Sequence, residues 1–235
     1  TAARYKFSNG TGELVGAITE DGGFDLALNS SVASVQQSKA GVLVTTTDGD
    51  VVNAKRAVVT VPLNLLNSVS FDPPLSSAKQ EASTLKHAGG GYKVFFEVQG
   101  DPGAVMTLSR SSDSPLIGSF TYKRGEQHSV LVGFSLEPGA LDKTVDEWQA
   151  VLEEFLPGVK LLSTFGHDWG DDALSQGSWC TYRPGTIAKF ANALPQQEGH
   201  VVFASGDHAQ AWRGFIEGAI ASGSKSAIAV AKSFN

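Results

Sequence analysis

The chain has 235 residues, of which 41% are apolar and 18% are charged, a balance typical of a folded protein with enough material for a core. The formal net charge is -6 and no basic cluster is present, which argues against nucleic acid as a partner. No apolar run is long enough to span a membrane, and the N-terminal stretch lacks a signal-peptide pattern. Cys180 is the single cysteine, which excludes an intrachain disulfide and makes the cytoplasm the expected location.

The first part of the chain combines a helical pattern with short strands. After a strand-like start at residues 4–7, a helix is expected to begin near Thr11, whose hydroxyl can cap its first turn. A strand is expected over residues 29–35, with Val32 and Val35 facing inward.

A hairpin and a buried strand follow. The β-branched run 41–47, the Asp48-Gly49 turn and the alternation that resumes at Val51 predict two antiparallel strands. The continuous apolar run 57–61 is typical of a strand buried on both faces, and Pro62 ends it.

The middle of the chain changes character at Gly89. Before it we expect a short helical turn at 63–66, an extended Pro-rich link at 71–75 and a polar helix at 76–85. After it, Gly, Pro and Ser turns join several strands, which predicts an antiparallel or mixed sheet, followed by an amphipathic helix and one more strand. The expected strands are 92–98, 104–109, 116–122, 130–136 and 161–169, and the expected helix is 141–156.

The last part of the chain pairs a short apolar strand at 201–204 with a long helical pattern, separated by Ser205-Gly206-Asp207 and a polar turn. A strand that ends at small residues and leads into a helix is a common place for nucleotides to bind, because backbone N–H groups there can face an anion. Trp212 and Phe215 are three apart on the expected first helical turn, so both can face one cavity. Taken alone, the stretch is better explained as an ordinary βα unit with Trp212 in the core.

The order of these patterns predicts an α/β fold of mixed α+β character. A part similar to a nucleotide-binding domain (1–70) is followed by a sheet-and-helix insertion (71–165), and the chain then returns to the first part (166–235).

Four segments carry a resemblance to a known family. They are 56–63 with the Phe71-Asp-Pro-Pro-Leu link, Gly91-Tyr-Lys-Val, Trp169 with Gly177-Ser-Trp, and Phe203-Ala-Ser-Gly-Asp with 212–219. In this order they resemble the C-terminal half of the flavin-containing amine oxidases, which include monoamine, polyamine and many L-amino-acid oxidases. The resemblance implies an FAD-binding domain made of 1–70 and 166–235, with a substrate-binding domain at 71–165 built on a mixed sheet.

The resemblance also implies an activity. An FAD-dependent oxidase of this family oxidises the C–N bond of an amine or amino acid by hydride transfer to flavin N5, the imine hydrolyses, and oxygen reoxidises the flavin to give hydrogen peroxide. Two alternatives stay open. One is a flavin dehydrogenase or desaturase that uses another electron acceptor, and the other is a non-catalytic binding subunit of the same fold.

One departure from the family pattern affects the expected partners. The family begins with a βαβ unit that carries GxGxxG, and no such motif occurs in this chain. We therefore expect a processed or split chain that is inactive alone and binds a second chain carrying GxGxxG. A small-molecule amine or amino acid is the expected substrate, and a higher homo-oligomer is a further possibility.

By resemblance, the expected catalytic residues are Lys93, Trp179 and Phe215. The lysine would hydrogen-bond a water near flavin N5, and the two aromatic rings would form walls on either side of the substrate amine. The simpler alternatives are a lysine that points outward from its strand and two ordinary core aromatics.

By the same resemblance, the expected cofactor-binding residues are Val32, Trp169, Ser205, Gly206, Asp207 and Phe215. Val32 would meet the adenine through its backbone, although it could be an ordinary strand valine, and Asp207 could instead cap the last helix. Some monoamine oxidases attach FAD through a cysteine, but Ser178 occupies that position here. We therefore expect non-covalent FAD, with Cys180 as a small buried side chain. His167 and His208 have no partners at metal-ligand spacing, so no metal site is expected.

Overall fold

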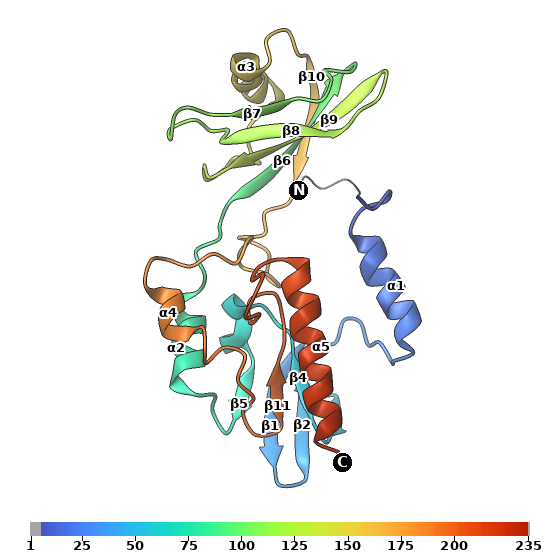
Figure 1. The fold of residues 1–235 in the computed structure, drawn as a ribbon, viewed down its shortest axis with the longest axis vertical. Coiled ribbons are helices and arrows are strands. Elements are labelled where there is room, and N and C mark those ends of the chain that lie inside the picture. The colour runs from blue at the N-terminus through green and yellow to red at the C-terminus, as the bar shows by residue number, and fades with distance from the viewer. Residues whose placement is uncertain (1–5, 235) are drawn as a thin grey trace.

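The structure is a computed structural model that describes residues 6–234. It contains mixed and antiparallel sheets together with helices, which confirms the predicted fold class. Figure 1 shows one sheet with its helix at one end of the molecule, and the remaining sheets and helices at the other. The expected strand at residues 4–7 lies partly outside the described residues, and Lys6 and Phe7 are not in a strand.

A four-stranded sheet contains the predicted hairpin. Strands β2 (Gly41–Thr46) and β3 (Val51–Ala54) are antiparallel, β1 (Val32–Ser38) pairs with β2, and β5 (Ser70–Asp72) runs parallel to β1. The expectation that Val32 faces inward is wrong, because its side chain is 38% exposed whereas that of Val35 is 3% exposed. The pairing register shifts between Val32 and Ser34, so Val32, the first residue of β1, lies opposite Thr46 at the end of β2, whereas Val35 lies opposite Val44 in its interior.

A two-stranded parallel sheet joins β4 (Ala57–Val59) to β11 (Val201–Phe203), two strands far apart in sequence. Both strands were predicted, but β4 ends earlier than expected. It is also not buried on both faces, because Val58 is 44% exposed. A parallel pair with an exposed apolar face lacks the cover that parallel sheets have in complete domains.

A five-stranded antiparallel sheet has the order β10-β6-β9-β8-β7. Its strands are β6 (Tyr92–Gln99), β7 (Met106–Leu108), β8 (Gly118–Lys123), β9 (His128–Ser135) and β10 (Leu161–Gly166). The sequence patterns left antiparallel and mixed arrangements open and the resemblance implied a mixed sheet, whereas the pairing is antiparallel throughout. The entering strand β6 and the leaving strand β10 are hydrogen-bonded neighbours.

Helix α3 (Val145–Phe155) covers one face of this sheet (Figure 1). Trp148 is fully buried against Phe96 of β6, and its indole N–H donates to the carbonyl of Ala140 at 3.0 Å. Thr144 and Glu147 form a capping box at the start of the helix, which explains why the helix begins later than the expected residue 141. On the opposite face, which we call the open face, Phe95 packs against Tyr122 and Phe165, which are 41% and 53% exposed.

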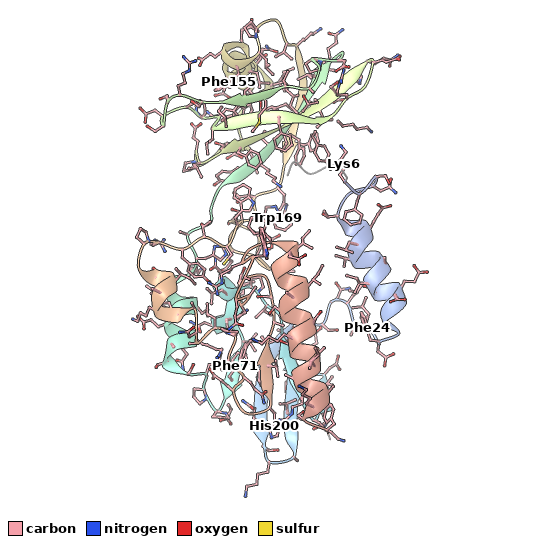
Figure 2. All side chains as sticks on the ribbon, in the orientation of Figure 1. Lys6, Phe24, Phe71, Phe155, Trp169 and His200 are labelled. Atoms are coloured by element: carbon pink, nitrogen blue, oxygen red, sulfur yellow. The ribbon has the colours of Figure 1, made fainter. Side chains whose placement is uncertain are left out.

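Short helices connect the sheets. The 3₁₀ helix η1 (Leu63–Ser68) follows β4 directly and packs on the predicted helix α2 (Ser77–Leu85). Helix α4 (Thr186–Phe190) was not predicted, and its Phe190 is buried. Helix α1 (Gly12–Gly22) contains no buried residue. In Figure 2, Phe24 lies just beyond α1, away from the rest of the chain.

The last helix, α5 (Ile216–Lys232), begins later than the sequence pattern suggested. The sequence pattern predicts Trp212 and Phe215 on the first turn of α5, but both residues precede the helix. Trp212 has a left-handed backbone with φ of 51°. The long loop between β11 and α5 therefore replaces the expected short turn. None of the helices in the described part of the chain has the length and hydropathy needed to cross a bilayer.

Candidate functional site

A cavity of about 340 Å³ lies where four separated segments meet, and we call it the Lys93 cavity. The segments are the end of β4, the start of β6, the loop after β10 and the end of β11. The lining residues are Thr60, Pro62, His87, Gly91, Lys93, Trp169, Ser175, Gly177, Ser178, Trp179, Ser205, Gly206 and Asp207.

Lys93 reaches the cavity from the open face of the five-stranded sheet. Its neighbour Val94 points to the core under α3, so strand alternation places the lysine on the opposite face. The Nζ atom lies 5.9 Å from the ring centre of Phe134 and 6.0 Å from that of Trp179. The side chain of Lys93 thus points away from the sheet core, into the cavity and toward an aromatic side chain that forms its wall.

Trp179 forms that wall. Its ring centre is 5.7 Å from that of Phe134, and its side chain is 37% exposed. The ring lies against Gly91, where a Cβ atom would come within 2.8 Å of the Trp179 ring. The glycine at this strand start is therefore needed for the indole to sit beside Lys93.

The end of β11 brings Ser205, Gly206 and Asp207 to the cavity. Asp207 does not cap the last helix, whose N-cap position is Phe215. Its Oδ2 atom instead accepts a hydrogen bond from the backbone N–H of Leu63 at 2.8 Å, at the start of η1. Asp207 therefore connects the end of β11 to the start of η1.

The structure brings only some of the expected site residues together. Lys93, Trp169, Trp179, Ser205, Gly206 and Asp207 line the cavity, and Phe215 and Val32 do not. Phe215 is 64% exposed, and its ring packs edge-on against that of Trp212 at 6.1 Å. The roles assigned to all of these residues stay predictions.

His87 also lines the cavity, and the sequence patterns do not identify it as a site residue. Its backbone N–H donates to Asn64 Oδ1 at 2.8 Å, and its Nδ1 accepts from the N–H of Gly89 at 3.1 Å. Burial lowers the pKa of the imidazole, and the nearby Asp207 carboxylate opposes this shift only in part. A neutral ring whose Nδ1 is an acceptor carries its proton on Nε2. Its place just before the Gly89-Gly90-Gly91 run was the available sequence signal.

Cys180 lies beside this site without lining the cavity. Burial first, and the Asp207 carboxylate second, raise the pKa of its thiol to about 12. The thiol is therefore protonated at neutral pH and is a poor nucleophile.

The lining residues fit a flavin. Trp169 and Trp179 expose aromatic surface, Lys93 supplies a cation, and the hydroxyl of Ser178 is buried without a hydrogen-bond partner among residues 6–234. A flat aromatic ring system edged with hydrogen-bond acceptors matches this set of donors and surfaces. Within the same residues, no cluster of His, Cys, Asp and Glu could hold a metal ion.

The sequence profile of the family described as flavin containing amine oxidoreductase matches residues 3–231. The chain belongs to this family. Its cofactor is accordingly FAD, and the resemblance carried by the four sequence segments is confirmed.

Individual relatives agree with this placement. The chain is 39% identical over 226 residues to a pseudooxynicotine dehydrogenase from Pseudomonas sp, covering 94% of this chain and 45% of the relative. It is 29% identical to a nicotine dehydrogenase of Pseudomonas putida, covering 95% and 46%, and 24% identical to human flavin-containing amine oxidase B, covering 94% and 46%. The chain thus spans about half the length of the curated relatives it matches.

Solved structures show the same fold. Putrescine oxidase bound to putrescine superposes with a TM-score of 0.81 at 20% identity, over 95% of this chain and 53% of that one. Cyclohexylamine oxidase from Brevibacterium oxydans gives a TM-score of 0.74 at 20% identity, over 94% and 51%.

Proposed function

We propose that the chain is part of an FAD-dependent enzyme that oxidises an amine of the nicotine series. The observation that carries the proposal is the Lys93 cavity, where a lysine and an exposed tryptophan meet the end of β11 in a chain of this family. The substrate class is taken from the relatives named for pseudooxynicotine and nicotine. These names favour an amine over an amino acid.

The residues of the cavity have separate roles in this proposal. The Trp179 indole holds the amine through its π face, an attraction of about 0.5 to 2 kcal/mol for a cation. Lys93, whose Nζ atom lies 6.0 Å from the centre of the same ring, would hold a water molecule by hydrogen bonding. When bound, FAD supplies the redox chemistry by accepting the hydride of the amine carbon and passing electrons to oxygen.

The cofactor would be held by Trp169, Ser205, Gly206 and Asp207, and the family resemblance adds Val32 and Phe215, which lie outside the Lys93 cavity. We propose that it is not covalently attached, because Ser178 has no thiol and the Cys180 thiol is protonated. The division into an FAD-binding part (1–70 and 166–235) and a substrate-binding part (71–165) belongs to the same proposal.

A second polypeptide segment would complete the site. Ile216, Ile220 and Ile228 on α5 are each about half exposed, and Val58 of β4 is 44% exposed. Several apolar side chains on and after α1 are also exposed, namely Val15, Ile18, Phe24, Leu26 and Leu28. Exposed apolar surface of this extent marks an interaction site. We propose that a segment carrying GxGxxG, on the same or a second chain, covers it.

The test uses the full-length protein, or this chain together with that segment. The purified protein should show a flavin absorption spectrum that bleaches anaerobically when pseudooxynicotine or nicotine is added. No flavin, or no bleaching with any amine tested, would contradict the proposal.

A second candidate function is a flavin dehydrogenase that uses an acceptor other than oxygen, and the relatives named dehydrogenases favour it. Rapid reoxidation by oxygen with peroxide release supports the oxidase. Slow reoxidation by oxygen together with fast reoxidation by an artificial acceptor supports the dehydrogenase. A non-catalytic subunit would show no substrate-dependent flavin reduction and no reoxidation by either acceptor. Substitution of Lys93 or Trp179 would then leave its function unchanged.

A further inference from the structure

Asn64 connects the two chain segments that carry Lys93 and Trp179. It lies on η1 and is 6% exposed. Its Oδ1 atom accepts the backbone N–H of His87 at 2.8 Å, and its Nδ2 atom donates to the backbone carbonyl of Gln176 at 2.7 Å. One buried side chain thus holds a point shortly before Lys93 and a point shortly before Trp179.

One connected residue, Gln176, and the residue just before the other, Lys86, have an unusual backbone. Lys86 and Gln176 have φ values of 55° and 50°, which L-residues rarely adopt. The ammonium group of Lys86 donates to Gln176 Oε1 at 2.8 Å, so the two residues also hold each other. Backbone of this kind is strained in L-residues and persists only where surrounding contacts enforce it. Asn64 and Lys86 supply such contacts.

The two segments are closely fitted below this connection. A Cβ atom on Gly177 would lie 2.6 Å from Cε1 of His87, so the imidazole fills the space between the segments. The backbone N–H of Ser178 donates to the Gly89 carbonyl at 2.9 Å, and that of Ala88 donates to the Thr181 carbonyl. A shift of either segment would therefore be transmitted to the other.

η1 also reaches the third side of the cavity. The backbone N–H of Leu63 donates to Asp207 Oδ2, and Asn64 follows it in sequence. Two consecutive residues of η1 thus hold the β11 end, the start of β6 and the Trp179 loop.

We propose that Asn64 is a positioning residue that fixes Lys93 and Trp179 relative to each other through His87 and Gln176. The inference rests on the proposed function only for its kinetic consequence. A reacting group misplaced by about 1 Å can slow a reaction about a hundredfold, even when binding is retained. Loss of the Asn64 bonds should therefore lower the rate of the chemical step more than it weakens substrate binding.

The test compares Asn64→Asp with Asn67→Asp in the full-length protein. Asn64→Asp keeps an acceptor for His87 and loses the donor to Gln176. The control makes the same change on the same 3₁₀ helix, where Asn67 donates to Gln80 and Thr84, away from the cavity. Asn64→Leu, which loses both bonds, is a second variant, and Asn64→Asp decides the outcome if the leucine variant does not fold.

Two measurements are needed. In protein labelled with 5-fluorotryptophan, the fluorine signal of Trp179, assigned with Trp179→Phe, should shift or broaden in Asn64→Asp and stay unchanged in the control. Under anaerobic single turnover, the rate constant of flavin reduction should fall about tenfold or more in Asn64→Asp, with a smaller change in substrate Kd.

An unchanged Trp179 signal in Asn64→Asp would overturn the proposal, as would a reduction rate equal to that of the control. If the protein oxidises no amine, the proposed function fails, and the fluorine signal alone decides the role of Asn64.

Discussion

Gly89 and the backbone of Trp179 are in direct contact, so closely that a Cβ atom on Gly89 would lie 1.5 Å from the Trp179 carbonyl oxygen. Real Cβ atoms never approach an oxygen so closely, and both partners are main chain, so neither can turn aside. The absence of a side chain at Gly89 therefore allows the tryptophan segment to reach the start of β6.

The glycines of the run 89–91 give a matched test of this contact. Gly89→Ala should destabilise the protein by about 3 kcal/mol or more, because the backbone of the Trp179 loop has to move. Gly90→Ala should have little effect, because nothing lies within 4 Å of a Cβ at that position. Thermal unfolding followed by circular dichroism compares the two variants, and equal melting temperatures would show that the contact does not matter.

Lys93 should act mainly after substrate oxidation. Lys93→Met in the full-length protein should slow flavin reoxidation by oxygen about a hundredfold, because the hydrogen bond to water is lost. Anaerobic flavin reduction should change much less. Lys123→Met, which removes another exposed lysine of the same sheet, is the control for loss of charge. Stopped-flow absorbance measures both half-reactions, and a normal reoxidation rate in Lys93→Met would refute this role.

Lys79 should matter for folding. It is fully buried, and its ammonium group donates to the carbonyls of Ala193 and Gln196 and to Glu198 Oε1, at 2.7 to 2.9 Å. Burial lowers the pKa of Lys79, and Glu198 opposes the shift. Lys79→Met should cost about 3 to 5 kcal/mol, because it removes three charge-assisted hydrogen bonds and the cationic partner of Glu198.

The control for Lys79 is Lys189→Met, which breaks the exposed ion pair with Glu81 and should change stability little. Urea denaturation gives both values, and a similar midpoint for the two variants would contradict the expectation.

His208 should make stability depend on pH. It is fully buried, and burial, reinforced by Lys79 and Arg213 and opposed by Asp207, lowers its pKa to about 4. Between that value and the ordinary pKa of 6.5, the unfolded chain binds a proton that the folded chain does not, so stability falls as pH falls. The loss should approach about 3 kcal/mol at the acid end.

His208→Asn tests this origin. The variant should be less stable at neutral pH but should have a flatter pH dependence between 6.5 and 4. His128→Asn, which removes an exposed imidazole, is the matched control. An unchanged slope in His208→Asn would assign the acid sensitivity to another group.

The flavin should be released by acid. Precipitation of the full-length protein should leave the yellow colour in the supernatant, and Cys180→Ser should retain as much flavin as the parent. Flavin that stays with the precipitated polypeptide would contradict non-covalent binding.

Sequence patterns were sufficient to predict those elements whose formation depends on one strong local signal. The Asp48-Gly49 turn fixed the hairpin, and the apolar spacing of Trp148 and Leu152 placed α3. The residues carrying the family resemblance led to Lys93 and Trp179, and the structure places both at one cavity.

Sequence patterns did not predict features that depend on contacts between residues far apart in the chain. Asn64 resembles any polar residue of a short helix until His87 and Gln176 arrive from other parts of the chain. Trp212 has helical spacing to Phe215, but its left-handed backbone keeps it outside α5. Val32 is exposed because it lies at the end of the ladder between β1 and β2, a position that alternation alone does not reveal.

The adjacency of β6 and β10 has a consequence for how this family can diversify. The segment between β6 and β10 leaves the rest of the chain and returns to it through two neighbouring strands, so its two ends lie side by side. Insertions, deletions or recombination inside such a segment leave the surrounding chain with its original neighbours. A graft that exchanges the residues beyond Lys93 on β6 up to the end of β10 should therefore change the substrates accepted, while the residues proposed to hold the cofactor keep their places.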